Sequence, residues 1–471
     1  MRLLNTSTLQ VQNFHPGKVP HYAILSHRWG DDEVTFQDMQ APHEALLERP
    51  GYKKVQRFCQ IALSKGFEFV WVDTCCIDKM NNTELSEAVN SMFDWYRSSV
   101  VCYAYLADVK TTDDITRSQW FTRGWTLQEL IAPIRVLFYN SDWHQIGSKA
   151  SHAKQIEQRT GIPSDVLAIN SDQEYSVAQV FSWAAGRKTT RLEDEAYCLL
   201  GLLRIYIPLV YGEGQNAFNR LQREIINRSS DESIFAWAKA LDKSGALASS
   251  PADFANCRDI ERVKKASGEF QMTNKGLRIQ LPLVPLGENV WAGILSCDNR
   301  RGFRCGIKLM EREKGEYNRV ECSEIYWHNR HEALPDSQTV YITDLRNSAF
   351  DWMIPSRWPE KYRTVVDLSS ALRSGYHVDD MRTLKQGLRR FPLMYSMQWE
   401  EAESNVLSIT LPPSGFWGGL LLKITIPTLD LLSLGFTTGY LGWISSLTIL
   451  LTHANQRALG GHSASGKEKI W

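Results

Sequence analysis

Two glycine-containing segments have the spacing of phosphate-binding loops, but neither has the context that such a loop needs. Residues 212–217 (GEGQNA) fit the dinucleotide pattern G-x-G-x-x-A. That pattern binds a pyrophosphate at a strand–turn–helix junction, whereas a mainly helical segment with Pro208 precedes it here. Residues 461–467 (GHSASGK) approach a P-loop, yet Glu468 stands where serine or threonine is required. The sequence therefore predicts neither an NTPase nor a conventional dinucleotide-dependent dehydrogenase.

The cysteines and histidines do not have the spacing of a metal site. Nine cysteines are scattered along the chain, no C-x-x-C pair occurs, and Cys75 and Cys76 are adjacent, which is poor spacing for tetrahedral zinc. His27 stands alone beside an apolar run, and we expect a satisfied structural imidazole. Several cysteines lie in apolar runs, where a reduced thiol behaves as a small hydrophobic residue: Cys59, Cys75, Cys76, Cys102 and Cys198. We predict a cytoplasmic protein with no bound metal and no cofactor.

Over the first 150 residues, strand-like segments alternate with helical segments, and these must position the candidate functional residues. Apolar runs typical of buried strands cover residues 22–26, 68–73, 100–106 and 135–139. Helical patterns cover residues 53–65, the segment from Asn82 or Thr83 to about Arg97, and residues 119–130. This order predicts a doubly wound parallel α/β sheet, in which ligands bind beyond the carboxyl ends of the strands.

After the α/β core, the predicted secondary structure and the composition of the chain change again. We predict an α/β core over residues 1–150, a helical extension over 151–240, a β-rich domain over 241–410 and an apolar tail over 411–471. The stretch from Leu431 to Thr452 carries no charge over 22 residues, which is about the length that spans a bilayer. Because serine, threonine and glycine dilute it, membrane contact through this stretch is an alternative that we do not favour. Formal charge is zero and no basic run occurs, so no nucleic-acid partner is expected.

Several long motifs in fixed order resemble the fungal heterokaryon incompatibility (HET) family. They are YAILSHRWGDDEVTFQDM at 22–39, WVDTCCIDKMNNTELSEAVNSMFDWY at 71–96, WFTRGWTLQELIAP at 120–133, TTRLEDEAYCLLGLL at 189–203 and YGEGQNAFNRLQREI at 211–225. The resemblance covers roughly half of the chain. Arg28 departs from it, because a threonine or another small residue is commoner there, and it adds positive charge at the mouth of the expected site.

The resemblance also implies a fold and a catalytic residue. HET domains look related to TIR domains, so the core is expected to be TIR-like. In enzymatic TIR domains a W-x-x-x-E helix carries the glutamate that cleaves NAD, and residues Trp125 to Glu129 have that pattern. The analogy selects Glu129 as the catalytic carboxylate and NAD as a candidate substrate. From the residues alone, Glu129 is either a solvated helix residue or a partner of Arg123.

The same analogy suggests the rim of the site. Ser26, Arg28 and the backbone at Gly30 are candidates for holding phosphate or ribose oxygens, and Asp73 and Asp78 follow the second strand. Trp125 is included among these candidate binding residues because it begins the W-x-x-x-E pattern that ends at Glu129. The alternatives are structural: Asp73 forms a turn at the end of a strand, and four tryptophans are core aromatics (Trp29, Trp71, Trp120 and Trp125).

The function implied is that of a heterokaryon incompatibility effector, in which self/non-self recognition is coupled to programmed cell death, as a form of fungal innate immunity. NAD hydrolysis by the TIR-like core is the enzymatic version of this function. The alternative is a non-enzymatic signalling or adaptor module that acts by self-association and partner recruitment. Either version implies a homo-oligomer in the active state and a non-self trigger protein.

Overall fold

The computed structural model describes residues 1–343 except 42, 170–173, 242 and 264–267, and after residue 343 it describes the backbone of strands β17 to β23. The chain divides into two compact units, Met1–Ser348 and Ala349–Trp471. The predicted site residues all belong to the first unit. The predicted division of the chain into four segments stays a prediction. The division between the two compact units lies near residue 348.

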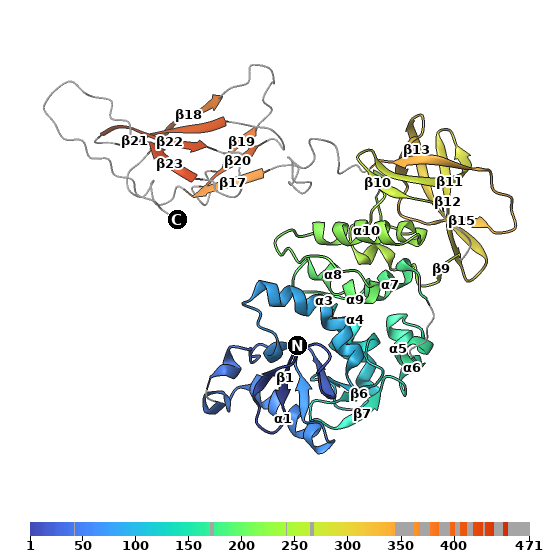
Figure 1. Cartoon of the computed structure of the whole chain (residues 1–471). Coiled ribbons are helices and arrows are strands. Elements are labelled where there is room, and N and C mark those ends of the chain that lie inside the picture. The colour runs from blue at the N-terminus through green and yellow to red at the C-terminus, as the bar shows by residue number, and fades with distance from the viewer. Residues whose placement is uncertain are drawn as a thin grey trace. The chain divides into compact units, whose positions relative to one another are not determined.

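The first sheet combines four parallel strands with antiparallel edges (Figure 1). Its order is β2-β1-β4-β3-β5-β6-β7, in which β4, β3, β5 and β6 run parallel. Every residue of β3 is buried, as expected for a parallel strand covered on both faces. The α/β core is thus confirmed, although the prediction lacked the antiparallel edges. The strands are β1 (Arg2–Asn5), β2 (Val11–Asn13), β3 (Tyr22–His27), β4 (Phe69–Trp71), β5 (Val101–Tyr105), β6 (Val136–Tyr139) and β7 (Gln145–Ser148).

Helices connect these strands, with boundaries that differ from the predicted ones. Asn81, not Asn82 or Thr83, caps α3, because its side chain accepts hydrogen bonds from the backbone N–H groups of Thr83 and Glu84. The helix predicted over 119–130 is two helices, η4 and α4, separated by residues 123–125. The helices are η1 (Asp38–Gln40), η2 (His43–Leu46), α1 (Pro50–Ser64), α2 (Asp73–Cys76), α3 (Asn82–Ser98), η3 (Thr112–Arg117), η4 (Gln119–Thr122) and α4 (Thr126–Ile131).

A layer of helices follows the sheet and packs against α3 and α4 (Figure 1). Residues 192–203 contain two short helices, α8 and α9, and Arg204 closes α9 in a left-handed conformation. The break between them lets α9 approach α3 closely, since Gly201 lies directly against the side chain of Phe93. The layer contains α5 (Ala153–Thr160), α6 (Ser164–Ile169), α7 (Val177–Ala184), α8 (Asp194–Tyr197), α9 (Leu200–Leu203), α10 (Asn216–Arg228) and η5 (Glu232–Phe235).

A nine-stranded sheet completes the first unit and confirms the β-rich character of the C-terminal region. Its strands pair antiparallel except for β14 with β16. The fully buried Arg319 of β14 donates hydrogen bonds to the carbonyl oxygens of Phe235 and Trp237, so the sheet and the helical layer share one interior. The elements are β8 (Lys243–Ser244), η6 (Pro251–Phe254), β9 (Ile260–Arg262), β10 (Gln271–Thr273), β11 (Gly276–Gly287), β12 (Val290–Asn299), β13 (Phe303–Glu313), β14 (Glu316–Val320), β15 (Tyr326–Asn329) and β16 (Ser337–Ile342).

The second unit is described through strands alone. They are β17 (Tyr362–Asp367), β18 (His377–Lys385), β19 (Ser396–Glu400), β20 (Val406–Leu411), β21 (Gly418–Ile426), β22 (Leu429–Thr437) and β23 (Ser446–Leu450). The uncharged stretch from Leu431 to Thr452 includes part of β22 and all of β23, which pair antiparallel, and its other residues lie outside the described part. Among the described residues no helix has the length and apolarity to cross a membrane.

Candidate functional site

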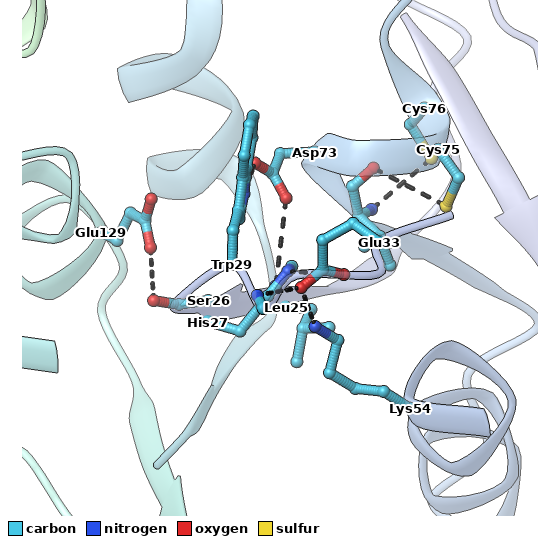
Figure 2. A network of polar contacts seen from close by, with 12 residues as sticks. Leu25, Ser26, His27, Trp29, Glu33, Lys54, Asp73, Cys75, Cys76 and Glu129 are labelled. Carbon is cyan, nitrogen blue, oxygen red and sulfur yellow. Dashed lines mark hydrogen bonds and ion pairs between the residues drawn. The ribbon is translucent and has the colours of Figure 1, made fainter. Parts of the chain in front are cut away.

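Glu129 lies on α4 and reaches the carboxyl end of β3. Its carboxyl group accepts a hydrogen bond from the Ser26 hydroxyl, as Figure 2 shows. Ser26 is fully buried and also accepts a hydrogen bond from the Trp120 indole N–H at 2.8 Å. Because Glu129 is 7% exposed and bonded to Ser26, both simple alternatives for it are wrong: it is neither solvated nor ion-paired with Arg123.

Burial controls the protonation state of Glu129. Removal from water raises the pKa of its carboxyl group from 4.5 to about 8, and the nearby Asp73 charge adds to this rise. The Ser26 hydrogen bond and the positive charges of Arg123 and Arg187 act in the opposite direction. At pH 7 the Glu129 carboxyl is therefore mostly protonated, which differs from the fixed anion that the sequence analogy implies.

Asp73 and Trp29 form the second part of the site. The Trp29 indole N–H donates to the Asp73 carboxylate at 2.7 Å, and Figure 2 shows the ring standing between Glu129 and Asp73. Trp29 is 41% exposed, so its prediction as a core aromatic is wrong, while Trp71 and Trp120 are buried as predicted. The indole is therefore a partly exposed aromatic ring tied to the polar centre through Asp73.

His27 lies between two acidic side chains, Glu33 and Asp73. Its Nε2 atom is 3.6 Å from Glu33 Oε2 and its Nδ1 atom is 3.9 Å from Asp73 Oδ1. Neither ring nitrogen has a hydrogen-bond partner among the described residues, so the imidazole is buried but not satisfied as predicted. Burial acts to raise the pKa of Glu33, but His27 and Lys54 outweigh it and lower that pKa to about 2.

The other predicted rim residues differ in their contacts with this centre. Arg28 is exposed, and the Gly30 backbone N–H donates to Glu33 at 2.7 Å. Asp78 accepts from the Gln37 side-chain amide and from the Met80 backbone.

Trp125 points to the helical layer instead of the site. Its indole N–H donates to Asp194 at 3.2 Å, and Tyr211 donates to the other oxygen of the same carboxylate at 3.0 Å. Arg187 from the same layer donates to the Arg123 carbonyl and the Thr126 hydroxyl at the start of α4. The helical layer therefore fixes the helix that carries Glu129.

Sequence reasoning missed several charged residues of the site. Glu33 and Lys54 form a buried ion pair, and Lys79 and Arg123 lie within cation–π distance of Trp29. These contacts join residues that are distant in sequence, so no local pattern indicates them. The described residues contain no group of three His, Cys, Asp or Glu side chains placed to hold a metal ion.

The topology places this centre where ligands bind in open α/β sheets. From β3 the chain first adds β4 on one side and then β5 on the other, so strand order reverses between β3 and β5. Ser26 and His27 occupy the last positions of β3 at this reversal, paired with Ala104 and Tyr105 of β5. A crevice for a ligand forms at such a point, outside the carboxyl ends of the strands.

Residues 22–114 match the family described as Heterokaryon incompatibility protein (HET), and this segment contains Ser26, Trp29 and Asp73. This part of the α/β core is therefore similar to the HET family. Glu129 of α4 follows the matched segment in the same α/β core. A second match, to a domain of unknown function (DUF8212), covers residues 216–253, which include all of α10.

The chain is also similar to a fungal incompatibility protein. It is 45% identical over 224 residues to vegetative incompatibility protein HET-E-1 of Podospora anserina, a match that covers 44% of this chain. The matched region spans 16% of the length of that relative. No solved structure matches the chain.

Proposed function

We propose that this chain is an effector of fungal heterokaryon incompatibility whose HET domain hydrolyses NAD and thereby triggers cell death. The incompatibility role rests on the similarity to HET-E-1. The enzymatic part rests on one observation: a buried carboxyl group, Glu129, lies at the strand-order reversal of a parallel sheet. The parallel order β4-β3-β5-β6 is the flavodoxin-like order, which is compatible with the TIR-like reading.

The proposed reaction breaks the N-glycosidic bond between nicotinamide and ribose. Water adds to the ribose carbon, nicotinamide leaves with the bonding electrons, and the products are nicotinamide, ADP-ribose and a proton. The transition state resembles an oxocarbenium ion, which a carboxylate beside the sugar stabilises. Glu129 supplies this carboxylate after losing its proton, and Ser26 orients it by hydrogen bonding.

Nicotinamide release from NAD by the purified full-length chain tests the enzymatic proposal. Glu129→Gln keeps the shape of the side chain but cannot become an anion, and it is expected to lower the rate by roughly 10²–10³-fold. Glu87→Gln, an exposed position on α3, is the matched control and should leave the rate unchanged. Absence of nicotinamide release by the wild-type chain at pH 7 to 9, also under conditions that promote self-association, would rule out NAD hydrolysis.

One observation favours the non-enzymatic alternative. The raised pKa and the hydrogen bond to Ser26 suit Glu129 to a structural role, in which a neutral carboxyl group ties α4 to β3. In that case the HET domain acts in the cytoplasm as an adaptor that self-associates and binds a non-self trigger protein. Growth of a fungal host expressing the Glu129→Gln chain separates the two functions, because the variant spares an adaptor and silences an enzyme.

A further inference from the structure

Two positively charged side chains gather around the exposed indole of Trp29. The Lys79 ammonium lies 3.5 Å from the ring centroid, and the Arg123 guanidinium carbon lies 5.3 Å from it. The ring itself is held by its hydrogen bond to Asp73. Lys79 follows β4 and α2, whereas Arg123 precedes α4, so separate parts of the fold bring the two charges to one place.

Neither charge is neutralised by an ion pair. In the part of the chain that the structure describes, no carboxylate lies within 4 Å of the Lys79 ammonium or the Arg123 guanidinium. Burial lowers the pKa of Lys79, and the positive charge of Arg123 lowers it further, against the opposing effect of Asp73. Cation–π contact with Trp29 offsets only part of this cost.

Charges that are partly removed from water are normally paired, so this arrangement favours an anion. A phosphate group matches it, because a guanidinium binds phosphate through paired N–H donors and an ammonium adds a point charge. Arg123 is also close enough to Glu129 to lower the pKa of its carboxyl group. An anion bound by Arg123 therefore lies beside the buried centre.

We propose that Lys79 and Arg123, gathered at the indole of Trp29, bind the pyrophosphate group of a nucleotide. The exposed indole supplies an aromatic surface for the base or ribose once the anion draws the two cations away from the ring. The identity of the nucleotide as NAD or ADP-ribose rests on the proposed function, whereas the phosphate site rests on the side-chain geometry alone.

Calorimetric titration of the full-length chain with ADP-ribose, pyrophosphate and adenosine tests this site without relying on catalysis. ADP-ribose and pyrophosphate are expected to bind and adenosine is not, with affinity that falls as salt rises. Lys79→Met and Arg123→Gln are each expected to weaken ADP-ribose binding by at least about tenfold, since a hydrogen bond to a charged group contributes roughly 1.5–3 kcal/mol. Lys79→Arg keeps the charge and should retain most of the affinity.

Lys65→Met is the matched control, because Lys65 is an exposed cation at the end of α1, away from Trp29. Thermal unfolding of each variant identifies any that fail to fold. The proposal is overturned if neither phosphate compound binds the wild-type chain, or if folded Lys79→Met and Arg123→Gln bind ADP-ribose as the wild type does. Equal affinity for pyrophosphate and ADP-ribose supports the phosphate site but overturns its assignment to a nucleotide.

The two proposals fail separately. ADP-ribose binding that depends on Lys79 and Arg123, without nicotinamide release, removes the enzymatic function and supports the phosphate site. Nicotinamide release that is unaffected by Lys79→Met and Arg123→Gln overturns the phosphate site and leaves the enzymatic function in place.

Discussion

Glu129 couples the stability of the fold to pH. Its pKa is about 8 in the folded chain against 4.5 for an ordinary glutamate, so the folded state holds one extra proton between these values. The stability that this proton contributes is fully present below pH 4.5 and is lost as pH rises through about 8. The same burial that supports a catalytic role therefore makes ionisation of Glu129 unfavourable.

Glu129→Gln is expected to remove this pH dependence, because the amide stays neutral and keeps a hydrogen-bonding oxygen for Ser26. The unfolding free energy of the variant should rise relative to that of the wild type by about 1.4 kcal/mol per pH unit across this window. Denaturant unfolding of both proteins from pH 5 to pH 9 measures the difference. Parallel stability curves for the two proteins would show that Glu129 is not buried in its protonated form.

The ion pair of Lys54 with Glu33 offers a second residue-scale prediction. Both side chains are mostly buried, at 13% and 10% exposure. Lys54→Met leaves the Glu33 charge beside His27 without its cation, and it is expected to destabilise the fold by about 3 kcal/mol. The neighbouring Lys53 pairs with the exposed Glu48 on the surface, so Lys53→Met should have no measurable effect on thermal unfolding. Equal effects of the two substitutions would contradict the buried pair.

Local patterns and a family resemblance selected the residues of the polar centre, and their roles in binding or catalysis stay predictions. Ser26 and Asp73 end buried apolar runs, and the W-x-x-x-E spacing indicated Glu129, which the structure brings into hydrogen-bond contact with Ser26. The exposure of Trp29 was not predictable in this way, because aromatic residues are usually buried. Its position depends on contacts with Asp73, Lys79 and Arg123, which come from three later segments.

At the scale of elements, the alternation of strands and helices was predictable and the ends of elements were not. Apolar runs identified the four parallel strands, because strands buried on both faces are apolar throughout. The antiparallel strands β1, β2 and β7 are short and partly polar, so they lack that signal. The break between α8 and α9 depends on packing against α3, which no pattern within residues 192–203 records.

This packing of α9 on α3 leads to an element-scale prediction. A Cβ atom at Gly201 would overlap the Cβ atom of Phe93, which cannot move away without shifting α3. Gly201→Ala is therefore expected to destabilise the first unit by about 1–3 kcal/mol. At Gly186 an added Cβ meets nothing within 4 Å, so Gly186→Ala should be neutral or stabilise by about 0.4–1 kcal/mol. Thermal unfolding of both variants measures this, and equal midpoints would contradict close packing of α9.

At the scale of the molecule, the helical layer depends on the sheet that follows it. Arg319 of β14 is fully buried, bonds to the carbonyl of Phe235 at 2.9 Å and lies 3.7 Å from the ring of Trp237. Glu232 accepts two hydrogen bonds from Ser296 of β12, at 2.7 and 3.0 Å. The predicted boundary at residue 240 lies within this shared interior, since the change to β-rich composition marks where strands begin and not where the core ends.

A chain that ends at residue 240 is therefore expected to fold poorly, whereas residues 1–348 should fold as one unit. The shorter fragment exposes Phe235 and Trp237 and leaves the Glu232 carboxyl, 1% exposed in the full chain, without Ser296. Limited proteolysis and thermal unfolding compare the two fragments with the full chain. Arg319→Met in the 1–348 fragment should reproduce part of the loss, because it leaves two buried carbonyl oxygens without donors, at about 1–3 kcal/mol each. A cooperative, protease-resistant 1–240 fragment would show that the α/β core and its helical layer are independent of the nine-stranded sheet.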